Sequence, residues 1–155
     1  MVSPEVLRRY EFFAGLNPEH LNAIAMLTEE VALDENATVF ETDQPAEHLY
    51  VMVDGCVELH YVAVDEISPE LRKELFVSEM NPGDPFGISA LLEPFVYQGT
   101  VRTRCPSHVL RVEAGGLRAL SEVDPQINAA LMRQMAQAAL SRLHDTRILL
   151  AAARA

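Results

Sequence analysis

Apolar and polar residues alternate in short runs through the central part of the chain, between Val31 and Val112. Turn signals separate these runs at intervals of about 8 to 12 residues, a spacing typical of a β-sandwich or barrel. The clearest run is Cys56 to Val64, in which every second side chain faces the same way. One of its faces carries Val57, Leu59, Tyr61 and Ala63. The pattern therefore predicts a mainly β domain.

Turn-forming residues divide this region into strands. Asp54-Gly55 predicts a two-residue hairpin that joins Leu49–Val53 to the Cys56–Val64 strand. The polar segment Asp65–Arg72 predicts a solvated hairpin loop, and Asn81-Pro82-Gly83-Asp84 predicts a type II turn. The remaining elements predicted are strands at Leu75–Met80, Tyr97–Arg104 and Ser107–Glu113 and a short helical run at Ser89–Leu92.

Helices are predicted on both sides of the β region. Ser3-Pro4 and Asn17-Pro18 each place an N-cap residue before a proline at the first helical position, so two short helices begin the chain. Asp124-Pro125 repeats this signal and begins a long helix towards Leu150, about 39 Å at 1.5 Å per residue. A helix of this length exceeds what one small domain needs to cover itself.

The long helix carries two apolar stripes. A narrow seam recurs at steps of four and three, a spacing suited to a partner helix, and favours a homodimer. The alternative is that this seam packs on the chain's own barrel, although a second stripe, Ile127, Leu131 and Met135, is better placed for that contact. The seam consists of Met132, Ala136, Ala139, Leu143, Thr146 and Leu150.

Length and composition predict one folded domain. The 155 residues suffice for a single core, and 49% hydrophobic against 23% charged residues argues against disorder. We predict N-terminal helices in residues 1–30, the β region in 31–113 and C-terminal helices, which would dimerise, in 116–155.

Charge and cysteine usage limit the partners and the compartment. The formal net charge of −11, without a basic cluster, argues against nucleic-acid binding by this chain alone. No apolar stretch has the length of a signal peptide or membrane span, so we expect no membrane partner. Cys56 and Cys105 show no C-x-x-C spacing, which argues against a disulfide framework and favours a reducing cytoplasm.

No catalytic or metal-binding pattern is present. Ser89 and Ser107 lie outside any G-x-S-x-G motif, and no paired carboxylates or Cys/His arrangement can be identified, so we predict that the protein is not an enzyme. The five histidines are scattered without an i, i+4 pair, which predicts no metal site. They are His20, His48, His60, His108 and His144.

Four segments in a fixed order resemble a known family, the cyclic-nucleotide-binding domains of the catabolite-activator type. They are Phe13-Ala14-Gly15-Leu16; Val39 to Ala46 with Leu49 to Leu59; Pro82 to Gly87 with Ala90-Leu91-Leu92; and Gly99-Thr100-Val101-Arg102. The resemblance implies a regulatory module built as an eight-stranded β-roll, a double-stranded β-helix or jelly roll, with short flanking helices. It also implies a long last helix that mediates dimerisation. Some relatives carry haem or an iron–sulfur cluster, but no His or Cys here can be picked as its ligand.

The resemblance also places a ligand site at the turn after Phe86. The phosphate would lie over backbone N–H groups of Gly87 to Ala90, a segment that includes Ser89. The family's ribose-binding Glu is replaced by Ile88, and its phosphate-binding Arg by Tyr97, which Gln98 and Gly99 follow.

Losing both contacts would weaken a family-typical ligand by about 3–6 kcal/mol, which argues against cyclic-AMP sensing in the usual mode. Arg142, which falls on a family hydroxyl pair that contacts the base, is a candidate replacement cation; the alternative is a solvated helix residue. Ile88 and Tyr97 would either line a pocket for a less charged ligand or fill the old cavity.

Three functions remain open at this point. The chain is a regulatory module that acts through protein–protein contacts, a sensor of a cyclic nucleotide or other small ligand through altered contacts, or a structural dimerisation domain. No cofactor is certain, and a cyclic nucleotide is the candidate. Transcription-factor relatives continue into a helix-turn-helix, whereas this sequence stops at Ala155, so we expect no DNA-reading half.

Overall fold

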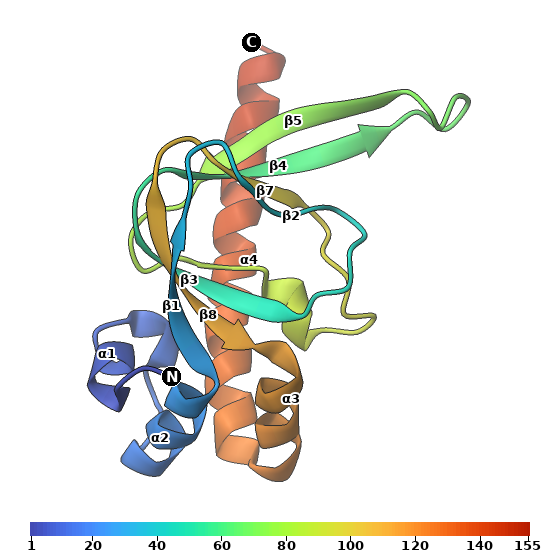
Figure 1. Cartoon of the computed structure of the whole chain (residues 1–155). Coiled ribbons are helices and arrows are strands. Elements are labelled where there is room, and N and C mark those ends of the chain that lie inside the picture. The colour runs from blue at the N-terminus through green and yellow to red at the C-terminus, as the bar shows by residue number, and fades with distance from the viewer.

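Two four-stranded antiparallel sheets form a β-roll in the computed structural model, which describes residues 1–155 (Figure 1). The strand order is β1-β8-β3-β6 in one sheet and β2-β7-β4-β5 in the other. The strands are β1 (Thr28–Leu33), β2 (Thr38–Phe40), β3 (His48–Asp54), β4 (Val57–Val64), β5 (Arg72–Glu79), β6 (Pro85–Phe86), β7 (Thr100–Thr103) and β8 (Ser107–Glu113). The predicted fold class, a mainly β roll with short N-terminal helices and a long C-terminal helix, is confirmed.

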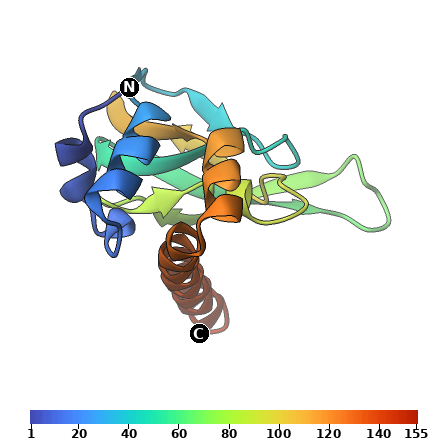
Figure 2. The same cartoon turned by 90° about the horizontal axis from the view of Figure 1, so that it is seen from below.

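Helices α1 (Pro4–Arg8), α2 (Pro18–Met26) and α3 (Ala114–Val123) gather at one end of the roll, where α4 (Pro125–Ala153) begins (Figures 1 and 2). The predicted helix starts are confirmed. Ser3 accepts a hydrogen bond from the Glu5 amide, and Asn17 forms a reciprocal capping box with His20. Two short 3₁₀ turns, η1 (Glu11–Phe13) and η2 (Ile88–Leu91), complete the helical elements.

Several strand boundaries differ from those predicted, and β5, for example, begins at Arg72 and not at Leu75. The roll begins at Thr28 and not at Val31, because Thr28 already pairs with Val112 of β8. Strand β7 begins only at Thr100, because the residues around Tyr97 pair with a loop instead: the Asp43 amide donates to the Tyr97 carbonyl at 2.8 Å.

The predicted hairpin at Asp54-Gly55 is wrong. Strands β3 and β4 belong to different sheets, so this tight turn carries the chain from one sheet to the other. Gly55 has φ of +108°, and a Cβ there would lie 2.3 Å from Ser107 Oγ, so close backbone approach also requires the glycine. The true hairpin is β4–β5, which projects from the roll as a two-stranded arm around the solvated loop predicted at Asp65–Arg72 (Figure 1).

The structure also corrects the expectation about cysteine. Cys56 and Cys105 form a disulfide that links the β3–β4 turn to the β7–β8 turn. The two cysteines are 49 residues apart, and their Cα atoms lie 5.2 Å from each other. Spacing along the chain could not reveal the pair, because only the roll topology brings these two turns together.

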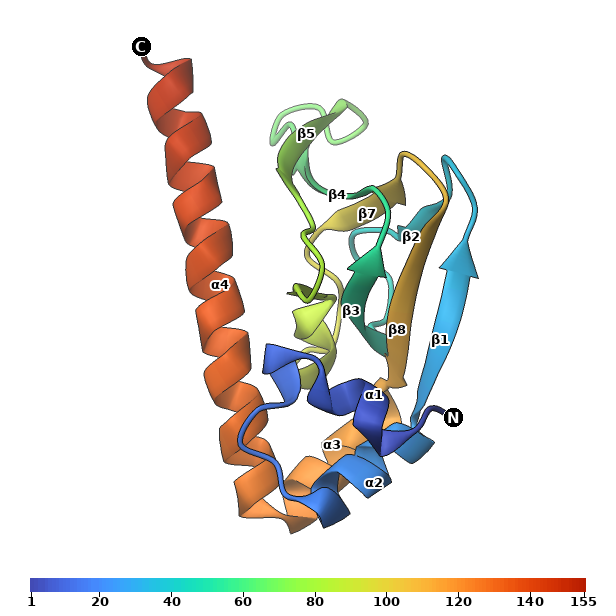
Figure 3. The ribbon, with the colours of Figure 1, turned by 90° about the vertical axis from the view of Figure 1, so that its left-hand side faces the viewer.

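Helix α4 runs along the roll and then beyond its core (Figure 3). Its N-terminal half buries Ile127, Leu131, Met135 and Ala138, so the second stripe packs on the roll as predicted. The C-terminal half exposes Leu140, Leu143, Ile148, Leu149 and Leu150. Even this helix lacks a stretch apolar enough to cross a bilayer, as do the shorter ones.

Candidate functional site

Four aromatic rings fill the interior of the roll. Phe40 of β2 stacks on Tyr97 with ring centroids 3.7 Å apart, and Tyr50 of β3 stacks on Phe86 of β6 at 5.0 Å. Phe40 also contacts both Tyr50 and Phe86, so the four rings form one cluster, which we call the aromatic floor. Each of these side chains is almost completely buried.

The hydroxyl of Tyr97 bonds to the protein itself. It donates to the His48 carbonyl at 2.6 Å and accepts from the His48 amide at 3.2 Å. Burial raises the pKa of Tyr97 well above its ordinary value, so the phenol stays neutral at physiological pH. Tyr97 therefore supplies neither a positive charge nor a free donor at the position where the family places an arginine.

Tight packing requires a glycine in the turn after Phe86. Gly87 has φ of +68°, and a Cβ there would approach the His48 carbonyl and the Tyr97 ring to 3.2 Å each. Helix η2 follows directly, and Ala90 donates its amide to the Gly87 carbonyl. Ala90 is fully buried, whereas Ile88 is half-buried and packs against the core.

Arg118 of α3 holds this turn from behind, a role that sequence reasoning missed. Its guanidinium donates to the carbonyls of Ala90 and Ala46, each at 2.7 Å, and lies 4.0 Å from the centroid of the Phe95 ring. Nothing in the local pattern of α3 distinguishes Arg118, because its partners are backbone groups far away in sequence.

An apolar cavity of about 810 Å³ lies between the aromatic floor, the β4–β5 hairpin and the C-terminal half of α4. Eight of the nine predicted site residues line it, and the ninth, Ala90, is buried behind them. The eight are Phe86, Gly87, Ile88, Ser89, Tyr97, Gln98, Gly99 and Arg142. Sequence reasoning did not identify the outer walls of the cavity. These walls consist of Leu59, Tyr61 and Leu75 of the hairpin and of Thr146, Leu149 and Ala153 of α4.

Arg142 contributes a positive charge to this cavity. Its guanidinium donates to the Pro85 carbonyl at 2.6 Å and contacts the Met80 sulfur at 3.2 Å, so it is not a solvated helix residue. Burial lowers the pKa of Arg142, while the nearby Asp84 and Asp145 act in the opposite direction. Arg102, by contrast, bonds to Glu74 and Thr38 outside the cavity.

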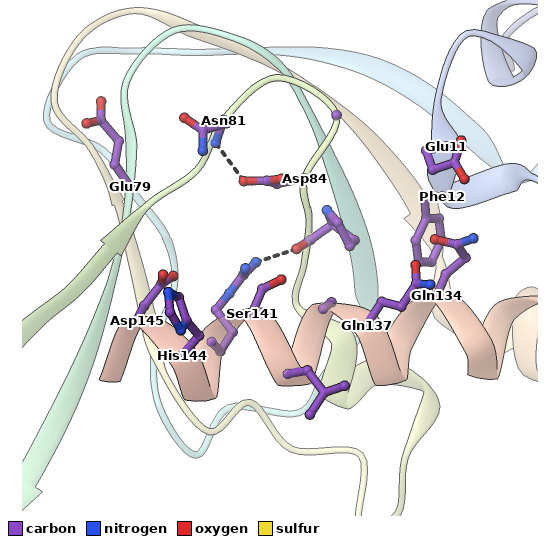
Figure 4. A pocket seen from close by; sticks show the side chains of 15 residues that line it. Glu11, Phe12, Glu79, Asn81, Asp84, Gln134, Gln137, Ser141, His144 and Asp145 are labelled. Atoms are coloured by element: carbon purple, nitrogen blue, oxygen red, sulfur yellow. Dashed lines mark hydrogen bonds between the residues drawn. The ribbon is translucent and has the colours of Figure 1, made fainter. Parts of the chain in front are cut away.

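A second, polar cavity of about 570 Å³ is shown in Figure 4, and Arg142 lines it as well as the apolar one. It is open between η1, the turn before β6 and α4, and it gathers the carboxylates of Glu11, Glu79, Asp84 and Asp145. The Asn81 amide donates to Asp84 at 2.8 Å and closes the predicted turn. Arg142 thus stands between an acidic cavity and an apolar one.

A two-sheet β-roll, a short helical turn after Phe86-Gly87 and a long final helix together define a class of regulatory domain. The family model for the cyclic nucleotide-binding domain matches residues 30–124, and the chain belongs to this family.

Relatives agree with this assignment. The chain is 25% identical over 133 residues to the "CRP-like cAMP-activated global transcriptional regulator" of Mycobacterium tuberculosis, covering 86% of this chain and 57% of that protein. It therefore spans just over half the length of this relative. A structure from Geobacter metallireducens GS-15, provisionally assigned as a cyclic nucleotide-binding protein, has a TM-score of 0.80 and 34% identity over 93% of this chain and 100% of that one. The sensor domain of the transcriptional regulator DNR from Pseudomonas aeruginosa, at 22% identity, shares the fold with a TM-score of 0.68 over 87% and 91% of the two chains.

Proposed function

We propose that this chain is a dimeric regulatory domain that does not bind cyclic AMP in the usual mode and that acts by contacting another protein. The observation that carries the first part is the engaged hydroxyl of Tyr97. Both hydrogen bonds of this group go to His48, and its ring is stacked on Phe40. Nothing at this position attracts a cyclic phosphate.

The ribose position supports the same proposal. Ile88 offers a hydrocarbon side chain where the family uses a carboxylate, so a ribose hydroxyl would lose a charged hydrogen bond. Two such losses amount to about 3–6 kcal/mol, or about 10²- to 10⁴-fold in affinity. A ligand of micromolar affinity would then bind with a dissociation constant of about 0.1–10 mM.

The dimer part of the proposal rests on α4. All the residues of the predicted seam except the half-buried Met132 are exposed, and the stripe beside them is already buried on the roll. A second copy of the helix would remove this apolar surface from water. We propose contact with another protein as the output of this domain, because a formal net charge of −11 without a basic cluster argues against nucleic acid as the partner.

Two measurements test the proposal. Isothermal titration of cyclic AMP and cyclic GMP should give no binding with a dissociation constant below about 0.1 mM, with the cAMP-activated Mycobacterium tuberculosis regulator as the positive control. Light scattering after size-exclusion chromatography should give the mass of two chains. A micromolar dissociation constant for cyclic AMP would overturn the first part, and a monomer at high micromolar concentration would overturn the second.

A further inference from the structure

The apolar stripe of α4 continues past the point where the helix stops touching the core. Ile127, Leu131, Met135 and Ala138 follow one another at steps of four and three and are buried on the roll. Four residues further along the same face lies Arg142, followed by Leu149 and Ala153, and these line the cavity instead. The helix therefore presents an apolar face with a single cation to a space that no side chain fills.

The opposite walls of this cavity are also apolar. The β4–β5 hairpin contributes Leu59, Tyr61 and Leu75. The aromatic floor contributes three of its rings, Phe40, Phe86 and Tyr97. The volume of about 810 Å³ falls within the range of about 300–1,000 Å³ typical of small-molecule pockets. Apart from Arg142, polar side chains are few: Ser89, Gln98, Thr146 and the Tyr61 hydroxyl line the cavity, while the Tyr97 hydroxyl and His60 already have protein partners, so a highly polar ligand would find few partners.

Charge is distributed unusually around this cavity. The chain has 23 acidic and 12 basic residues, yet the lining contains no carboxylate. Both hydrogen-bond partners of Arg142 are neutral, and Asp84 and Asp145 line the acidic cavity without pairing with it. His60, also in the lining, already pairs with Glu58. An anion in the apolar cavity would give the half-buried guanidinium an ionic partner.

We infer that this cavity binds an apolar monocarboxylate, with the carboxylate at Arg142 and the hydrocarbon body between the β4–β5 hairpin and the C-terminal half of α4. A carboxylate matches the planar fork of a guanidinium, and an apolar body matches the remaining walls. This inference rests on the proposed function, because it names the ligand class of the same regulatory site.

Calorimetric titration with decanoate, kept below its micelle concentration, tests the inference against the neutral analogue 1-decanol. Decanoate should bind to the full chain at least about tenfold more tightly than 1-decanol, because only the carboxylate forms a charged hydrogen bond. Arg142→Met replaces the guanidinium with an unbranched, uncharged side chain and should remove this preference. Arg147→Met removes an equal charge from an exposed position of the same helix and should leave it unchanged.

A second pair of variants probes the wall. Leu75→Asp puts a negative charge into the lining at a residue that is 40% exposed, so the fold should tolerate it while decanoate affinity falls about tenfold or more. Leu71→Asp places the same charge on the exposed loop outside the cavity, and it should leave the affinity unchanged.

Equal binding of decanoate and 1-decanol, absence of binding by both, or an unchanged preference in Arg142→Met would each overturn the inference. These results leave the proposed function standing, because nucleotide affinity and oligomeric state are measured separately. Conversely, micromolar cyclic AMP binding with no decanoate binding would overturn the inference together with the first part of the proposed function.

Discussion

The two halves of α4 have a similar share of apolar residues but opposite environments. Between Pro125 and Ala138 the helix is capped at its first turn and buries one apolar stripe completely. Between Ala139 and Ala153 it carries as many apolar residues, but nearly all of them are exposed or face a cavity. The contrast teaches that hydrophobic periodicity identifies a helix face without saying what covers it. The first half stabilises the fold, and the second carries the exposed apolar surface on which we propose that a partner helix and a ligand bind.

The largest effect that we expect comes from the buried half. Leu131 is fully buried, so Leu131→Ala should lower the free energy of unfolding by about 2–5 kcal/mol through lost burial and a new cavity. Urea unfolding of the two proteins at the same low concentration measures this loss. The exposed half supplies the control: Leu140→Ala, at a residue that is 64% exposed, should change stability by less than about 0.5 kcal/mol. Equal losses in both variants would contradict the division of the helix.

The next largest effect concerns association. Leu143 lies on the predicted seam, is 43% exposed and does not line either cavity beside α4. Leu143→Glu should raise the dissociation constant of the dimer about tenfold or more, because a desolvated carboxylate would face its own copy. Ile148→Glu, on the opposite side of the helix and 55% exposed, should leave the constant unchanged. Sedimentation equilibrium would show the difference, and similar constants for both variants would exclude the seam as the interface.

Local signals were sufficient for much of the fold. The proline-linked caps at Ser3, Asn17 and Asp124 and the Asn81–Asp84 turn are all present. These features depend on residues within one turn of each other. The β-roll was expected from the family resemblance, because its strand pairing is long-range. The errors involve long-range contacts: the corner at Gly55, which Ser107 approaches, and the Cys56–Cys105 disulfide.

The candidate site shows the same limit. Positions of the family motif located Phe86 and Tyr97 of the aromatic floor and the turn around Gly87, and these residues do meet at one cavity. Their role in binding stays a prediction. The hydrogen bonds of Tyr97 to His48 and of Arg118 to Ala90 were not predictable, because backbone groups far away in sequence accept them. Which walls face each other depends on how α4 leaves the roll, and no local pattern encodes that direction.

A smaller effect should follow from the cap that anchors the buried half. The Asp124 carboxylate accepts from the Gln126 amide at 2.9 Å and from His20 at 2.8 Å. Asp124→Ala should therefore lower the thermal midpoint of unfolding. Asp124→Asn should lower it much less, since asparagine is an equally good N-cap. Asp145→Ala makes the same change in the other half, where the side chain has no hydrogen bond, and should leave the midpoint unchanged. Differential scanning calorimetry measures the thermal midpoints of the wild type and the three variants. An equal decrease of the midpoint in Asp124→Ala and Asp124→Asn would exclude capping as the cause.

The smallest effect is the pH dependence of that cap. Desolvation opposes ionisation of Asp124, but hydrogen bonds from the Gln126 amide and His20 outweigh it and lower the pKa of Asp124 below its ordinary value. Because the folded pKa lies below the unfolded value of about 3.9, this carboxylate stabilises the fold fully above that pH. Its contribution is lost as the pH falls further through the folded pKa. Urea unfolding from about pH 6 down to about pH 3 should therefore show a steeper loss of stability in the wild type than in Asp124→Asn, which cannot titrate at this position. Parallel curves would mean that the acid sensitivity of the protein arises elsewhere than at the N-terminus of α4.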